Sequence, residues 1–134
     1  MAEEKRIIRG FLIRVYDDVK NEVTVFEDTL ENIYGLLSVG LIDVTERQIG
    51  DFTYDIICDD EGLFVDEYLP SAYNSKCEPQ LVGNLLLVNH DEEGNFASLT
   101  DEQIEDLQKQ LFVCVTEWKG NTHIYRALKN VEYA

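Results

Sequence analysis

Residues 80–88 of the chain read QLVGNLLLV, and this stretch decides the fold. It is the most apolar segment of strand length, and residues 85–88 carry no polar side chain at all. An unbroken apolar run of this length is typical of a strand that is buried on both faces. The segment therefore predicts a central strand of a sheet, around which the rest of the chain packs.

A capping box follows this strand. Thr100 and Gln103 have the spacing at which a helix N-cap and its third residue exchange hydrogen bonds. The two acidic residues between them suit the positive end of a helix dipole. Apolar residues then recur at helical spacing as far as Trp118. The pattern predicts an amphipathic helix over residues 101–118 that packs on the sheet.

Other segments have the β-branched, aromatic or alternating composition of strands. The strands expected besides the central one cover residues 7–16, 22–26, 41–47, 52–56, 63–65 and 122–128. The first two form a hairpin, and a turn that ends in Gly62 precedes residues 63–65. Residues 66–78 are expected to be irregular, and residues 127–134 could form a short helix or a frayed tail.

A second, shorter helix is expected before the third strand. Asp28 and Glu31 have capping-box spacing, so we expect a helix over residues 29–38. Together these patterns predict an α+β fold, with a mainly antiparallel sheet of five to six strands and both helices packed on one face. The length suits a single domain over residues 1–134 without a linker or second domain.

The charge is strongly one-sided. The 134 residues include 27 acidic and 11 basic side chains, which gives a net charge of -16. Residues 21–108 alone hold 21 acidic residues against Arg47 and Lys76, a net charge of -19. Such a surface opposes direct binding of nucleic acid or of an anionic membrane. No apolar run approaches the roughly 18 residues of a membrane helix, and no signal peptide is visible, so we expect a cytoplasmic protein.

The residues that usually carry catalysis or bind metals do not form a recognisable motif. Cys58, Cys77 and Cys114 are odd in number and lack the close pairing of a zinc site, so Cys58 and Cys114 are expected to be small core residues. His90 and His123 lie in no nucleophile motif, although His90 borders an acidic turn that would raise its pKa. We expect neither an enzyme nor a bound cofactor or metal.

Carboxylate pairs for acid–base catalysis could be drawn from Asp43, Asp51 and Asp55, but 27 acidic residues make such pairs inevitable. Two turns are particularly acidic, and neither has the ligand spacing of a calcium loop. We identify their side chains as candidate partner-binding residues: Asp59, Asp60, Glu61, Asp91, Glu92 and Glu93.

Several motifs resemble a family of unknown function. They are the hairpin DIICDDEGL at residues 55–63, the strand LVGNLLLV at residues 81–88 and the helix start SLTDEQI at residues 98–104. The resemblance covers about residues 7–112. It implies a small protein encoded by a phage, plasmid or other mobile element of bacteria, and it implies no particular activity.

The sequence thus favours a small acidic, non-catalytic accessory protein that acts by binding a protein partner. The alternative is a nucleic-acid mimic, in which rows of carboxylates occupy the basic cleft of a host nuclease, restriction enzyme or other DNA-binding protein. Either partner could be a basic nucleic-acid-binding protein. The sequence leaves the oligomeric state and the identity of the partner open.

Overall fold

The fold is mainly β, with two sheets, and not the expected α+β arrangement around one sheet of five to six strands. The computed structural model describes residues 5–59 and 69–134, of which 55% lie in strands and 14% in helices. The elements in chain order are β1 (Ile7–Arg14), β2 (Lys20–Glu27), α1 (Leu30–Leu37), β3 (Ile42–Ile49), β4 (Phe52–Asp59), β5 (Pro70–Tyr73), β6 (Pro79–Val82), β7 (Leu85–His90), β8 (Phe96–Ala97), α2 (Asp101–Lys109), β9 (Leu111–Trp118), β10 (Asn121–Leu128) and β11 (Val131–Tyr133).

The larger sheet has seven strands in the order β11-β3-β4-β7-β1-β2, with β8 paired to β7. All of its pairs are antiparallel, and the β1–β2 hairpin matches the expected one. Strand β7 lies between β4 and β1, and its residues 85–88 are completely buried. The prediction of a central strand at residues 85–88 is confirmed.

The expected strand over residues 80–88 is broken in two, however. Gly83 has a φ of +78°, and the chain turns there from β6 in the smaller sheet to β7 in the larger one. Asn84 is buried at this switch, where its side chain accepts a hydrogen bond from the Val15 amide at 2.8 Å and donates one to the Leu37 carbonyl at 3.0 Å. Residues 80–88, which form one continuous segment in the sequence pattern, therefore contribute strands to both sheets.

The smaller sheet has four strands in the order β6-β5-β10-β9. The largest difference from the sequence prediction concerns this sheet. The expected helix over residues 101–118 ends at Lys109, and residues 111–118 form β9. The capping box of Thr100 and Gln103 is present as expected. Gln110 ends the helix, and its carbonyl accepts a hydrogen bond from the Lys129 amide at 2.9 Å. This long-range contact fixes the helix end.

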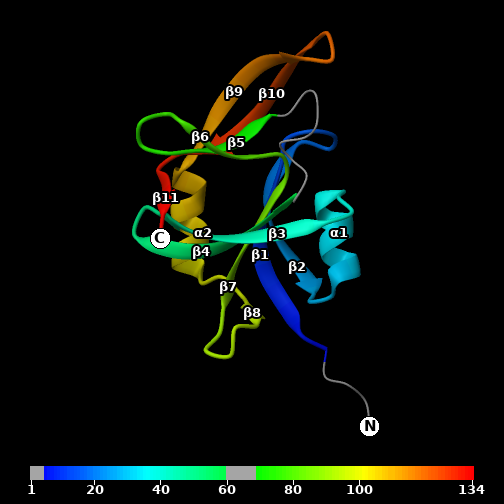
Figure 1. Cartoon of the computed structure of the whole chain (residues 1–134), viewed down its shortest axis with the longest axis vertical. Helices are drawn as coiled ribbons and strands as arrows, with labels where there is room; N and C mark the ends of the chain where they lie inside the picture. The colour runs from blue at the N-terminus through cyan, green and yellow to red at the C-terminus, as the bar shows by residue number, and fades with distance from the viewer. Residues whose placement is uncertain (1–4, 60–68) are drawn as a thin grey trace.

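Both helices were expected on one face of the sheet, but they lie on opposite faces. Buried residues of α1 (Ile33 and Leu37) join one core cluster, and those of α2 (Ile104 and Leu107) join the other. Alternate residues of β7 point into the two clusters. Figure 1 shows the two helices on either side of the larger sheet, with the β9–β10 hairpin extending away from it.

Residues 131–133 form an edge strand of the larger sheet, and not a helix or a frayed tail. Residues 70–73, expected to be irregular, form β5. The turn at Gly62 and the strand over residues 63–65 lie outside the described residues. Among the residues that the structure describes, no helix is long and apolar enough to span a membrane.

Candidate functional site

Asp59 and Asp91, one residue from each acidic turn, lie at opposite ends of the central strands. Asp59 ends β4, whereas Asp91 follows the last residue of β7, and β4 and β7 are antiparallel. Asp59 therefore lies apart from Asp91. Asp60 and Glu61 lie outside the described residues, and the structure places Glu92 and Glu93 on the exposed tip after β7.

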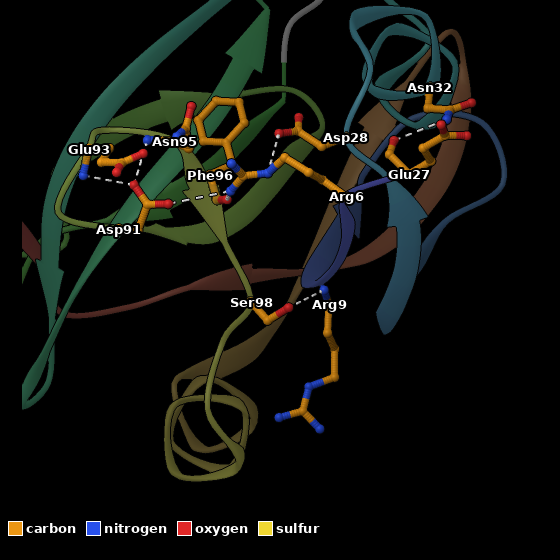
Figure 2. A network of polar contacts seen from close by, with 10 residues as sticks. All are labelled: Arg6, Arg9, Glu27, Asp28, Asn32, Asp91, Glu93, Asn95, Phe96 and Ser98. Atoms are coloured by element: carbon orange, nitrogen blue, oxygen red, sulfur yellow. Dashed lines mark hydrogen bonds and ion pairs between the residues drawn. The ribbon is translucent and has the colours of Figure 1, made fainter. Parts of the chain in front are cut away.

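Asp91 shapes its own turn. One carboxylate oxygen accepts hydrogen bonds from the amides of Glu93 and Asn95, each at 2.9 Å (Figure 2). These bonds, and the nearby Arg6 guanidinium, lower the pKa of the Asp91 carboxyl. Of the three acidic residues in this turn, Asp91 thus has a structural task, and Glu92 and Glu93 are left to face solvent.

Arg6 connects the turn to the start of β1. Its guanidinium donates to the Phe96 carbonyl at 2.8 Å and to Asp91 at 3.4 Å, and it lies 4.0 Å from the carboxylate of Asp28 (Figure 2). The Arg9 amide also donates to the Ser98 hydroxyl at 2.9 Å. These contacts hold the segment after β7 beside the first residues of β1.

A different group of residues has the geometry of a site. Glu46 of β3, Asp55 of β4 and His90 of β7 each offer a donor atom, and these three atoms all lie within 4.8 Å of one another. The His90 Nδ1 and Asp55 Oδ2 atoms are 2.8 Å apart. We call these three residues the His90 cluster. Only Asp55 is buried, with 8% of its surface exposed.

The larger sheet assembles the cluster through its register. Glu46 lies directly opposite Asp55 in the β3–β4 ladder, and Asp55 lies opposite Val88 in the β4–β7 ladder. His90 is two residues beyond Val88 and so points to the same face. Of the three carboxylates considered from the sequence, only Asp55 belongs to the His90 cluster. Asp43 lies opposite Cys58, and Asp51 lies in the β3–β4 turn.

This arrangement favours the protonated form of the His90 ring. The hydrogen bond that the protonated His90 ring donates to Asp55 is the main cause that raises the pKa of this ring above its usual 6.5. The charges of Asp55, Glu46 and Asp91 act in the same direction. The sequence prediction of a raised pKa at His90 therefore holds in direction, although a cross-strand carboxylate is the main cause and the adjacent turn is a smaller one.

We expect this shift to be measurable by NMR titration of the His90 ring in a buffer that contains a chelator. The pKa should lie above 6.5 in the wild type and return towards that value in Asp55→Asn. Because the folded-state pKa is the higher one, the protonated ring stabilises the fold fully below about pH 6.5, and this contribution is lost as the pH rises through the folded-state pKa. Equal values in the two proteins would contradict the contact.

The second structural feature is a groove along β9. It has a volume of about 560 Å³, within the range of ligand-binding pockets. One side consists of consecutive residues of β9 (112–118), and the other of residues from the β5 region and β10. We call it the β9 groove. Its lining residues outside β9 are Leu69, Pro70, Tyr73 and Tyr125.

Aromatic side chains make up much of the groove wall, which also includes the carboxylate of Glu117. The rings of Tyr73 and Phe112 pack edge to face with centroids 5.4 Å apart, and the Tyr125 hydroxyl donates to the Pro70 carbonyl at 2.9 Å. Burial raises the pKa values of Tyr73, Tyr125 and Cys114, which keeps all three neutral at physiological pH. The aromatic part of this lining suits an apolar or aromatic group.

Cysteine positions differ in part from the expectation. Cys58 is buried in the core as predicted, whereas Cys114 is half-buried in the β9 groove and Cys77 is exposed. The raised pKa of Cys114 disfavours its thiolate, so the groove does not present an activated nucleophile at this residue.

Strand β9 also presents an apolar outer face. Val113 and Val115 of β9 and Ile124 of β10 are exposed, and Val115 and Ile124 lie opposite each other in the ladder. Within the described part of the chain, β9 has β10 as its one sheet neighbour and is therefore an edge strand. The sequence prediction missed this surface because it placed Val113 and Val115 in a helix, although Ile124 lies in the strand expected over residues 122–128.

Comparison with known proteins gives one match. Residues 8–112 match the model of a domain of unknown function, DUF3846. No curated protein and no solved structure is significantly similar to the chain. The matched region includes the whole His90 cluster and ends at the second residue of β9. Because the match covers more than three quarters of the 134 residues, the chain belongs to the DUF3846 family.

Proposed function

We propose that this chain is a small acidic, non-catalytic accessory protein of a phage or other mobile element, which acts in the cytoplasm by binding a protein partner. The partner contributes an extended segment that lies along β9. The observation that carries this proposal is the aromatic β9 groove, which runs beside an edge strand.

An edge strand offers a main-chain binding surface. Every second residue of such a strand points its N–H and C=O groups away from its sheet neighbour, so an extended peptide can add to the sheet by hydrogen bonds. Side chains of the added strand alternate between two faces, and pockets on those faces give specificity. Here one face meets the aromatic lining near Phe112, and the other meets Val113 and Val115.

The charge distribution indicates the character of the partner. Residues 109–134, which contain β9 and β10, hold four basic and two acidic residues, whereas residues 21–108 carry a net charge of -19. The binding strand thus lies in the least acidic part of the chain, and the rest attracts a basic protein over a distance. We therefore propose a partner with a basic surface and an apolar extended segment.

The test compares Val115→Asp with Val25→Asp. Both valines are 65% exposed, and both lie on edge strands, Val115 on β9 and Val25 on β2 of the other sheet. Tagged wild type and variants are used to capture proteins from host cells, and the affinity of each captured protein is measured. We expect Val115→Asp to weaken the partner at least about tenfold, because a charge enters an apolar contact, and Val25→Asp to leave it unchanged.

The matched charge makes the result decisive. Each substitution adds one negative charge, so a partner attracted only by the acidic surface would respond equally to both variants. That result, together with displacement of the partner by duplex DNA, would contradict binding along β9 and support the nucleic-acid mimic. Loss confined to Val115→Asp supports the proposed surface.

A further inference from the structure

We propose that Glu46, Asp55 and His90 bind a divalent transition-metal ion of the zinc type through one ring nitrogen and two carboxylate groups. The site lies on the larger sheet and is independent of the β9 groove. It requires the shared proton between His90 and Asp55 to be replaced by the ion.

The distance between two of the donors already suits an ion. Donor atoms that bind one ion at about 2.1 Å in neighbouring positions lie roughly 3.0 to 3.4 Å apart. The Nδ1 atom of His90 and the Oδ2 atom of Asp55 are 2.8 Å apart, so an ion can enter between them with small shifts. Glu46 is exposed and within 4.8 Å of both, and rotation of its side chain closes the remaining gap.

The electrostatics also favour a cation. Glu46 and Asp55 lie directly opposite each other on neighbouring strands, an arrangement in which like charges destabilise a sheet. In the described ranges, neither carboxylate forms an ion pair with a lysine or arginine, and His90 is the hydrogen-bond partner of Asp55. A divalent ion would neutralise both carboxylates, one of which is buried.

The site is built on rigid elements. Its three residues lie on three adjacent strands of the central sheet, β3, β4 and β7, where the ladder hydrogen bonds fix their spacing. The contacts of Arg6 with Asp91 and with the Phe96 carbonyl brace the chain directly after His90. A metal site on braced strands needs little reorganisation to bind its ion.

The donor set defines the class of metal. Imidazole together with carboxylate suits Zn²⁺ and similar transition metals, whereas Ca²⁺ prefers oxygen donors in larger number. Three protein donors leave at least one coordination position for water, as in zinc sites that accept an outside ligand. The exposure of His90 and Glu46 places this open position at the protein surface.

The test is calorimetric titration of ZnCl₂ into the chelator-treated full chain. We use a Cys77→Ser background, because Cys77 is an exposed thiol. One ion should bind per chain, and CaCl₂ at the same concentration should not compete. His90→Gln and Glu46→Gln should each weaken Zn²⁺ binding at least about tenfold. Both residues are exposed, so these variants should fold, which circular dichroism checks.

Asp43→Asn is the matched control. It removes one negative charge from the same strand as Glu46, and its position, three residues away on β3, lies on the other face of the sheet. Its Zn²⁺ affinity should stay within about twofold of wild type. An absence of binding, unchanged binding in His90→Gln, or an equal loss in Asp43→Asn would overturn the site and leave an ordinary ion pair between His90 and Asp55. Substituting Co²⁺ gives a visible absorption band that should also disappear in His90→Gln.

Discussion

Asn84→Ala is expected to lower the free energy of unfolding by about 2 to 4 kcal/mol. The substitution leaves the buried Val15 amide and Leu37 carbonyl without their side-chain partner. Each buried polar group that loses its only partner costs about 1 to 3 kcal/mol. The measurement is urea unfolding followed by circular dichroism, with the slope of the transition compared between the two proteins.

Asn121→Ala provides the control for this prediction. Asn121 is exposed on the β9–β10 hairpin, and its side chain donates to the nearby Lys119 carbonyl. We expect its loss to change stability by less than about 0.5 kcal/mol. If Asn84→Ala were equally mild, the switch between the two sheets could not depend on the Asn84 hydrogen bonds.

Leu107→Ala is expected to cost about 2 to 5 kcal/mol. Leu107 has 0% of its surface exposed and joins α2 to the larger core cluster, so its truncation leaves a cavity. Helix α2 has nine residues, and its other buried apolar residue is Ile104. Thermal and urea unfolding should both show the loss.

Leu30→Ala is the matched helical control. Leu30 begins α1 and is 58% exposed, so the same change of side chain removes little buried surface. We expect a loss below about 0.5 kcal/mol. Similar losses at Leu107 and Leu30 would contradict the placement of α2 against the core.

Helix α2 illustrates how far the sequence could predict the fold. Its start follows from local chemistry, because the side chains of Thr100 and Gln103 bond the neighbouring backbone, and this part was correct. Its end does not, because residues 111–118 are apolar enough to satisfy a helical period and a strand period alike. The Lys129 amide, distant in sequence, bonds to Gln110 and ends the helix. Contacts of this kind leave no local signal.

The two sheets were hidden for a related reason. Residues 80–88 predict a strand correctly, but the chain changes sheets at Gly83, where φ is +78°, and the two halves pair with strands that are distant in sequence. The glycine inside the apolar run was the available signal in the sequence. Reading it as a bend would have divided the strand, although it would not have identified the partners of each half.

The candidate sites show the same contrast between local features, which the sequence reveals, and long-range contacts, which it does not. Asp55 and His90 were noticed separately, but their contact depends on the β4–β7 register, which a single sequence does not fix. Glu46 was assigned no role because one exposed glutamate among 27 acidic residues carries no signal. The acidic turns were visible because their charge is local, yet the structure places Asp59 and Asp91 at opposite ends of the central strands and engages Asp91 in its own turn.

We propose that a partner segment adds to the sheet along β9. Hydrogen exchange of the full chain, alone and with the captured partner, tests it most directly. We expect the amides of residues 112–117 to exchange more slowly in the complex, because the outward N–H groups of β9 become hydrogen-bonded. Slower exchange confined to the acidic turn at residues 91–94, with β9 unchanged, would contradict binding along β9.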